Sequence, residues 1–259
     1  MNTAFDIASV NYDNDFTFSN IGKAQRNRVF KYLNPLLSKE KLSILELNCG
    51  TGEDAIKLSK MGHRVLATDI SEGMIQTAKK KQQHRNCQFK VLDITAISKS
   101  NFDSKFDLIF SNFGGFNCLS QKEIQQFFNK ATSLLNKNGR IILVIMPKNT
   151  LWERIYFSLK RQFKKAKRRN TSTSIAVNVE GKSVQTWYYN PIDISALAST
   201  YSTQNIKPIG LWIPPSYLEK SILGRKTSIK ILSFLENIFA FSFLSKYADH
   251  FLIELKPKV

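Results

Sequence analysis

Cysteine, histidine and acidic residues are scarce in this chain of 259 residues, and each scarcity limits the kinds of site or partner that the protein can have. The three cysteines, Cys49, Cys87 and Cys118, are an odd number without a CxxC pair, so we expect neither a disulfide framework nor a structural zinc site. There are three histidines, and 20 acidic residues face 38 lysines and arginines, which gives a net charge of +18. This excess favours anionic partners such as nucleic acid, acidic lipid or phosphorylated substrates, although a well-solvated basic surface explains it equally well.

Long apolar runs are missing too. The longest apolar-rich stretch, Ile231 to Leu244, contains Glu236 and Asn237 and is too short to span a bilayer. The first residues, MNTAFDIASVNYDND, lack the basic region and apolar run of a secretory signal. We therefore expect a cytoplasmic protein, with peripheral membrane contact as an open alternative. Hydrophobic residues make up 42% of the chain, which is enough to form a packed core.

Short apolar segments alternate with helical patterns in the first half of the chain. This alternation predicts an α/β fold, a doubly wound, Rossmann-like and mostly parallel sheet with helices on both faces. Such sheets bind ligands at the carboxyl ends of their strands, where polar residues gather here at 48–52, 69, 93 and 111–115. The predicted strands are 43–47, 64–68, 88–92, 106–110 and 140–146, and the predicted helices are about 20–37, 52–60, 71–81 and 121–135.

The pattern changes after Met146. Leu151–Arg169 is predicted to be one basic amphipathic helix, with seven lysines and arginines at positions 160–169. A β-hairpin around Glu180-Gly181, a short helix after Pro191 and two closing strands follow, at 205–213 and 250–255, the last one antiparallel. We expect one domain, 1–259, made of a helical lead-in (1–40), a cofactor-binding core (41–147), the basic helix and hairpin (148–191) and a completion of the sheet (192–259) with a helical insertion at 214–249.

The segment Glu46-Leu47-Asn48-Cys49-Gly50-Thr51-Gly52 lies where a predicted strand turns into a helix. Its glycines let the backbone approach a ligand closely and adopt positive φ, and the helix N-terminus offers free N–H groups. Asp69 ends the next strand, where its carboxylate can accept the hydroxyl protons of a ribose. The run from Gly50 also fits G-x-G-x-x-A, which NAD and FAD sites share. Glu46 argues against NAD and FAD, because acids at positions 46, 69 and 93 suit a cofactor with positive charge and no phosphate.

With these residues, ILELNCGTGEDAIKLSKMGHRVLATDISEGMIQTAKKK resembles motifs I and II of the class I S-adenosylmethionine-dependent methyltransferases. VLDIT resembles the strand end that contacts adenine, and FDLIFSNFGGFN resembles the fourth motif. FDIASVNYDNDF resembles the N-terminal helix region of the branch that methylates quinones and small molecules. The resemblance covers about Phe5 to Met146. It implies an enzyme that uses S-adenosyl-L-methionine and no metal, and it does not specify the acceptor.

The resemblance also implies roles for individual residues, each carried over from a matching motif position. One departure is Asn48, where glycine is more usual. Ordinary packing remains an alternative for Met74, as does a helix cap for Asp93. The implied contacts are the loop Asn48, Gly50, Thr51 and Gly52 along the methionine part, Glu46 at the loop or amino group, Asp69 at the ribose, Ile70, Met74, Asp93 and Ile94 at the adenine, Ser111 or Asn112 beneath the methyl group, and Tyr12 closing over the cofactor.

No essential general base is evident in the sequence. Asp249 and His250 are weak catalytic candidates, because the start of an antiparallel final strand faces the ligand-binding edge; plain packing explains them as well. We favour a small-molecule or lipid acceptor, methylated on oxygen or carbon. RNA or DNA is the less favoured alternative, because the fourth-strand site reads Ser111-Asn112-Phe113-Gly114 instead of Asn/Asp-Pro-Pro-Tyr/Phe.

Two further alternatives stay open. Residues 151–169 can lie on an anionic membrane, contact phosphates or form a solvated helix. A non-catalytic protein that retains the cofactor fold is also compatible with the sequence.

Overall fold

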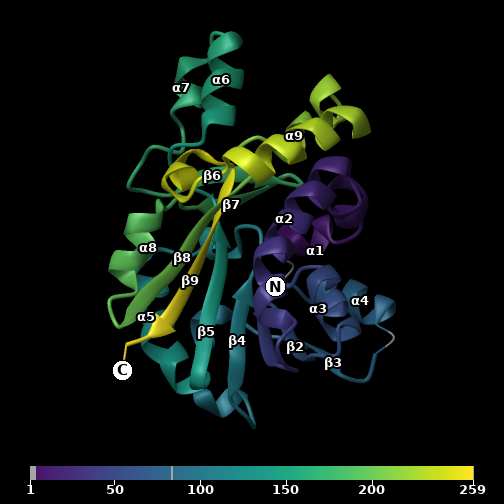
Figure 1. Ribbon diagram of the computed structural model, residues 1–259, viewed down its shortest axis with the longest axis vertical. Coiled ribbons are helices and arrows are strands. Elements are labelled where there is room, and N and C mark those ends of the chain that lie inside the picture. Colours follow the sequence, from purple (N-terminus) through teal and green to yellow (C-terminus); the bar gives the residue numbers. More distant parts are fainter. Residues whose placement is uncertain (1–3, 83, 259) are drawn as a thin grey trace.

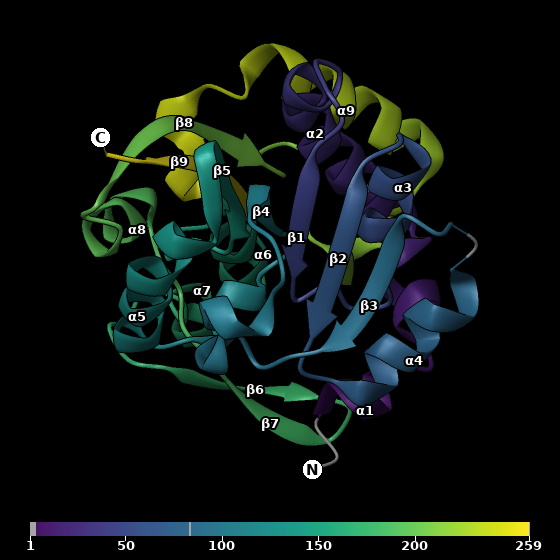
Figure 2. The same ribbon diagram turned by 90° about the horizontal axis from the view of Figure 1, so that it is seen from below.

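A computed structural model describes residues 4–82 and 84–258. Its centre is a seven-stranded sheet in the order β3-β2-β1-β4-β5-β9-β8 (Figures 1 and 2). β1 to β5 are parallel, and β9 pairs antiparallel with both neighbours. The predicted doubly wound fold with an antiparallel final strand is therefore confirmed. The strands are β1 Ser43–Leu47, β2 Arg64–Asp69, β3 Cys87–Val91, β4 Phe106–Ser111, β5 Leu135–Ile145, β8 Tyr201–Ile209 and β9 His250–Pro257.

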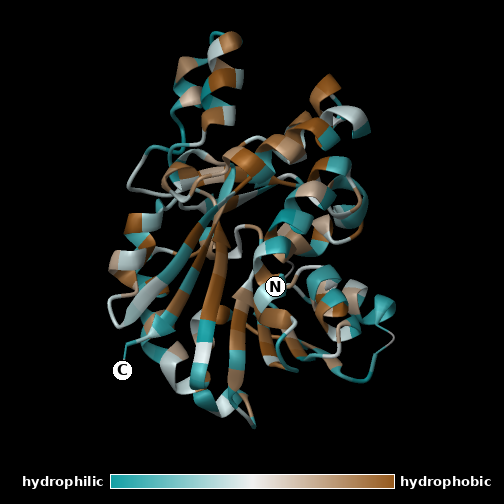
Figure 3. Cartoon of the chain, in the orientation of Figure 1, coloured by the Kyte–Doolittle hydropathy of each residue, from teal (hydrophilic) through white to brown (hydrophobic). Residues whose placement is uncertain are grey.

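Helices cover both faces of this sheet, and each face has its own apolar core. One core packs α2, α3 and α4 against the strands, through side chains such as Leu33, Leu58 and Ile75. The other packs α5 and α8, through Phe128 and Ile194 among others. Figure 3 shows the apolar strands between these more polar helices. The helices are α1 Ala4–Ala8, α2 Asn20–Leu37, α3 Glu53–Lys60, α4 Glu72–Lys81, α5 Gln121–Ala131 and α8 Pro191–Leu197.

Side-chain caps explain why several helices begin where the sequence predicts. The Ser19 hydroxyl accepts a hydrogen bond from the Gly22 N–H at the start of α2, and Ser71 accepts one from Met74 at the start of α4. The prediction was less accurate near β5. This strand starts at Leu135 and passes through the expected turn Asn138-Gly139, where its pairing with β4 is irregular. β8 likewise begins at Tyr201 and not at Asn205.

The remaining elements form a cap at the carboxyl edge of the parallel strands, at the top of Figure 1. A two-stranded sheet turns through Glu180 and Gly181, both with positive φ, as expected for a tight hairpin. Across residues 4–82 and 84–258, none of the helices combines the length and apolar character that a bilayer span requires. The elements of the cap are α6 Leu151–Leu159, α7 Phe163–Ala166, β6 Ile175–Val179, β7 Lys182–Thr186 and α9 Lys226–Phe239.

The prediction of one continuous helix over 151–169 was wrong. α6 ends at Leu159, Arg161 has a φ of +56°, and α7 is a separate short helix beside α6 (Figure 1). The buried Glu153 of α6 explains the reversal. It pairs with Arg168 at 2.8 Å and with Arg169 at 2.7 Å, so the chain after Leu159 must turn back to bring both guanidinium groups to one carboxylate. Two of the seven basic residues, the half-exposed Arg168 and the buried Arg169, are therefore paired with a carboxylate of the protein itself.

Candidate functional site

The loop after β1 has the backbone geometry expected of a close ligand approach. Asn48, Gly50 and Gly52 have φ values of +54°, +54° and +79°. A Cβ atom at Gly52 would lie 2.7 Å from the Phe89 ring, so only glycine fits there. The departure at Asn48 now has a physical reason, because asparagine is among the few non-glycine residues that adopt a left-handed conformation readily.

Asp69 fastens this loop to the end of β2. Its Oδ2 accepts a hydrogen bond from the Gly50 N–H and its Oδ1 one from the Ser71 N–H, both at 2.9 Å. Burial raises the pKa of Asp69, while these two N–H bonds act in the opposite direction. A carboxylate has about four lone-pair sites, so Asp69 retains acceptor capacity for a ligand hydroxyl.

A small cavity of about 30 Å³ lies beside the loop, and charged residues of both signs border it. Arg26 of α2 donates from Nε to Asp54 Oδ1 at 2.8 Å, and Asn112 donates to Asp54 Oδ2 at 2.9 Å. Glu46 is only 1% exposed, and burial followed by the charge of Asp54 raises its pKa well above the usual value. Within the part of the chain that the structure describes, Arg26 Nη1 and Glu46 Oε2 are buried without a hydrogen-bond partner.

Arg26 and Asp54 are site residues that sequence reasoning missed. Arg26 was one of several basic residues in a predicted helix, and Asp54 was a residue after the glycine loop. The fold brings them together across 28 residues, and Arg26 also lies 5.3 Å from the Phe113 ring centroid. For Asp54 the available signal was its position just after the predicted binding loop, which does not specify the direction of its side chain. For Arg26 the sequence offered no such signal.

The N-terminal segment, residues 4–18, lies over this loop. Asp13 accepts hydrogen bonds from the Thr51 hydroxyl at 2.5 Å and from Lys81 at 2.7 Å. Asp6 accepts from the Ser71 hydroxyl at 2.6 Å and from the Gly73 N–H at 2.9 Å. Tyr12 borders the cavity, and burial raises its pKa to about 12, so it stays a neutral phenol near neutral pH.

The other predicted contact residues lie at neighbouring strand ends. Asp93 caps a short 3-10 turn, Ile94–Ala96, by accepting from the N–H and hydroxyl of Thr95, both at 2.8 Å. The Ser111 hydroxyl donates to Asn48 Oδ1 at 3.3 Å. Met74 is buried and Ile70 is exposed. Helix capping and packing thus account for Asp93 and Met74 without a ligand, as the sequence allowed.

The structure does not bring Asp249 and His250 to the cavity. Neither residue lines it, although the ring of His250 lies 5.6 Å from that of Phe113, which does. Asp249 Oδ2 lies 3.2 Å from His250 Nδ1 and accepts from Gln25 at 3.1 Å. Although burial opposes ionisation, His250 and Arg169 lower the pKa of Asp249 to about 2. These contacts describe an internal ion-pair network that fixes the cap to β9.

Comparison with known proteins identifies the kind of domain. Residues 44–139 match the family described as "Methyltransferase domain", and this range covers β1 to the start of β5 with the whole glycine loop. The chain contains a class I methyltransferase domain. This confirms the family that the motifs predicted.

Individual relatives of the methyltransferase domain are distant. The chain is 30% identical over 163 residues to malonyl-[acyl-carrier protein] O-methyltransferase 1 of Ilyobacter polytropus, covering 62% of this chain and 55% of that protein. The corresponding enzyme of Acetivibrio thermocellus is 30% identical over 165 residues, 61% of this chain and 52% of the relative. The chain therefore spans about half the length of these curated relatives.

Solved structures agree with the fold of the methyltransferase domain. The magnesium protoporphyrin IX methyltransferase of Synechocystis, solved with bound SAH, superimposes with a TM-score of 0.57 at 17% identity. The match covers 92% of this chain and 86% of the other. At this identity the likeness concerns the fold, which here extends through the cap and β9 and beyond the matched residues 44–139.

Proposed function

We propose that this protein binds S-adenosylmethionine and transfers its methyl group to a small-molecule or lipid acceptor. The observation that carries the proposal is the pair of unpartnered buried atoms, Arg26 Nη1 and Glu46 Oε2, beside the glycine loop. The methionine end of this cofactor carries a carboxylate and an ammonium group. These opposite charges fit a guanidinium and a carboxylate that border one cavity, whereas the pyrophosphate of a dinucleotide would meet Glu46 with like charge.

The remaining predicted residues would hold the rest of the cofactor. Asp69 would accept from the ribose hydroxyls, Asp93 and the Ile94 N–H would meet the adenine edge, and Ile70 and Met74 would contact its faces. Asn48, Gly50, Thr51 and Gly52 would line the methionine part, Ser111 and Asn112 the floor beneath the methyl group, and Tyr12 would cover it. The bound cofactor supplies an electrophilic methyl group, and the chain supplies alignment and exclusion of water.

A carboxylate-bearing acceptor, methylated on oxygen, fits this site best. Carboxylate oxygen is nucleophilic without a general base, so such an acceptor needs no base from the protein. The two curated relatives named above are O-methyltransferases that act on malonyl groups carried by a protein. We therefore favour O-methylation of a small or lipophilic acid over methylation of carbon.

Methyl transfer from labelled S-adenosylmethionine tests this function directly. The protein is incubated with a lysate separated into lipids, small metabolites and RNA. We expect base-labile label, the mark of a methyl ester, in the lipid or small-metabolite fraction. Label in RNA would contradict the proposed acceptor class, and cofactor binding without any labelled product would favour a non-catalytic binding protein.

A peripheral membrane contact through residues 151–169 is a separate proposal. With Arg168 and Arg169 occupied by Glu153, the cations left at positions 160–169 are Lys160, Arg161, Lys164, Lys165 and Lys167, beside the exposed apolar side chains of Leu159 and Phe163. Basic and apolar residues together are typical of segments that lie in a membrane interface.

Replacing Glu46 with glutamine should stabilise the protein and weaken cofactor binding. Burial raises the folded-state pKa of Glu46 well above 4.5, the value expected for the unfolded chain. Protonated Glu46 therefore favours the folded state fully below pH 4.5, and this contribution to stability is lost as the pH rises through the folded-state pKa. Glu46→Gln avoids this loss, so we expect a higher urea midpoint at pH 7 and a smaller difference near pH 4.

Calorimetry should show at least about 10-fold weaker S-adenosylmethionine binding by Glu46→Gln, because the carboxylate facing the ammonium group is lost. The exposed Glu40→Gln serves as the control and should change neither quantity. Unchanged affinity in Glu46→Gln would contradict the role given to Glu46.

A further inference from the structure

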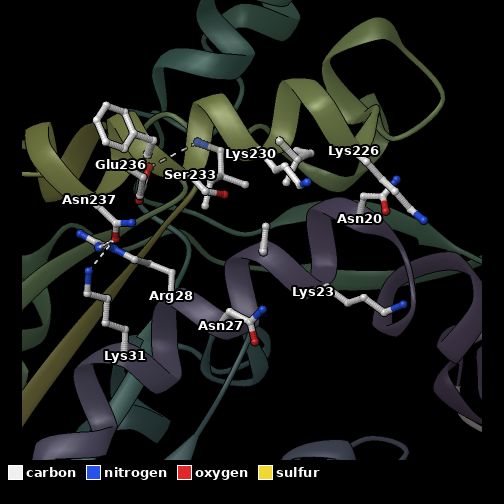
Figure 4. A pocket seen from close by; sticks show the side chains of 14 residues that line it. Asn20, Lys23, Asn27, Arg28, Lys31, Lys226, Lys230, Ser233, Glu236 and Asn237 are labelled. Atoms are coloured by element: carbon white, nitrogen blue, oxygen red, sulfur yellow. Dashed lines mark hydrogen bonds between the residues drawn. The ribbon is translucent and has the colours of Figure 1, made fainter.

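A second cavity, of about 620 Å³, lies between α2 and α9, and we call it the α2–α9 groove. Its cations come from both walls, Lys23, Arg28 and Lys31 from α2 and Lys226 and Lys230 from α9 (Figure 4). Ile213, Ile229 and Phe234 contribute apolar surface to the lining. The groove thus combines a positively charged rim with apolar walls.

The groove has one carboxylate, which is already in use. Glu236 is buried and accepts hydrogen bonds from the backbone N–H groups of residues 210–213, at 2.6 to 3.3 Å. Among residues 4–82 and 84–258, none of the five groove cations forms an ion pair within 4 Å. The groove therefore has five cations against one carboxylate, Glu236, whose charge interacts with that of Arg28 without a close ion pair.

Arg28 is the most informative of these cations, because it is only 7% exposed. Its Nη1 donates to Asn237 Oδ1 at 2.7 Å, and its guanidinium lies 4.5 Å from the Tyr32 ring centroid. Its Nε is buried and has no hydrogen-bond partner in the described part of the chain. A buried guanidinium without a counter-ion at hydrogen-bond distance is costly, and an anion at the groove would reduce that cost through its charge. Phosphate oxygens suit this donor geometry well.

The surroundings of the groove indicate where such a phosphate would come from. Phe234, at the groove, is 62% exposed, and Ile231 and Ile238 of α9 are also exposed. Beyond the end of α9, the stacked rings of Phe241 and Phe243 are exposed too, Phe243 by 74%. Large apolar side chains in water beside unpaired lysines favour the boundary between phospholipid headgroups and acyl chains.

We propose that the α2–α9 groove binds the phosphate of an anionic phospholipid while the exposed apolar side chains of α9 enter the membrane interface. Arg28, Lys31 and Lys230 hold the phosphate oxygens, and Phe234 and Ile238 contact the acyl chains. The assignment depends neither on methyl transfer nor on the contact proposed for residues 151–169.

Vesicle co-sedimentation tests the groove. The vesicles contain about 30% phosphatidylglycerol in phosphatidylcholine, or phosphatidylcholine alone, at about 0.1 M salt. Three double variants each reverse two positive charges and so change the net charge equally. They are Lys31→Glu/Lys230→Glu in the groove, Lys164→Glu/Lys165→Glu in α7, and Lys105→Glu/Lys137→Glu at the opposite edge of the sheet. We expect the groove variant to lose at least about 10-fold in partitioning and the opposite-edge variant less than about 2-fold.

Several outcomes would overturn the groove assignment. Equal losses in all three variants would indicate general charge attraction, and loss only in the α7 variant would place the contact there. Equal binding to phosphatidylcholine alone, whose phosphate is neutralised by choline, would exclude the proposed preference for an anionic phospholipid. Protection against thermal unfolding by inorganic phosphate, without vesicle binding, would indicate a soluble phosphate ligand. Unchanged S-adenosylmethionine affinity in the groove variant verifies that it is folded, and it separates this test from that of methyl transfer.

Discussion

Replacing Asp69 with alanine should lower the affinity for S-adenosylmethionine at least about 100-fold, because two charge-assisted hydrogen bonds worth about 1.5–3 kcal/mol each would be lost. The same carboxylate accepts the N–H groups of Gly50 and Ser71, so the variant would also release the glycine loop from β2. Isothermal titration calorimetry measures the affinity, and urea unfolding measures the cost to the fold.

Asp107→Ala is the matched control for Asp69→Ala. Asp107 also accepts two hydrogen bonds, from the Ser43 N–H and from Asn136, but at the opposite edge of the sheet. The Asp107→Ala substitution should lower the stability of the fold and leave the affinity for S-adenosylmethionine unchanged. Wild-type affinity in Asp69→Ala would refute the cofactor site, whereas equal losses of affinity in both variants would show that general destabilisation is the cause.

Replacing Arg26 with methionine should affect both stability and binding. The change leaves the buried Asp54 with Asn112 as its remaining partner, and breaking a buried pair typically costs about 3–5 kcal/mol. It also removes the donor that we assign to the cofactor carboxylate, which should weaken binding by about 10- to 100-fold. Urea unfolding and calorimetry measure the two effects on the same sample.

A double variant separates these two effects. In Arg26→Met/Asp54→Asn the unpaired charge is gone, so most of the stability should return while binding stays weak. Recovery of affinity together with stability would mean that Arg26 acts on the fold alone. Arg140→Met breaks another ion pair, with Glu254 at 2.7 Å, away from the cavity, and should leave cofactor binding unchanged.

The order of elements from α2 to α4 could be predicted because its signals are local. Ser19 and Ser71 cap helices within three residues of their partners, and β1 and β2 are short apolar segments next to turns. Asn48 could have been predicted as a residue with positive φ, since it occupies a position where glycine is usual. These features depend on residues that are close together in the sequence, so the sequence alone is enough to predict them.

The features that escaped prediction depend on distant partners. The break at Arg161 carries no glycine or proline and follows from the two arginines that converge on Glu153. The pair of Arg26 and Asp54 requires α2 to cross the start of α3 at one particular rotation. The α2–α9 groove joins helices about 200 residues apart in the chain, as the bond of Arg28 to Asn237 shows.

The position of the N-terminal segment has a consequence for the speed of the proposed enzyme. A cavity of about 30 Å³ holds a water molecule, not a nucleoside, so we expect the N-terminal segment, whose Asp6 and Asp13 bond to Ser71 and Thr51, to move when cofactor and product exchange. The lifetime of these contacts would then limit turnover. Substitutions at these two positions would then change the rate while the residues assigned to the cofactor stay the same.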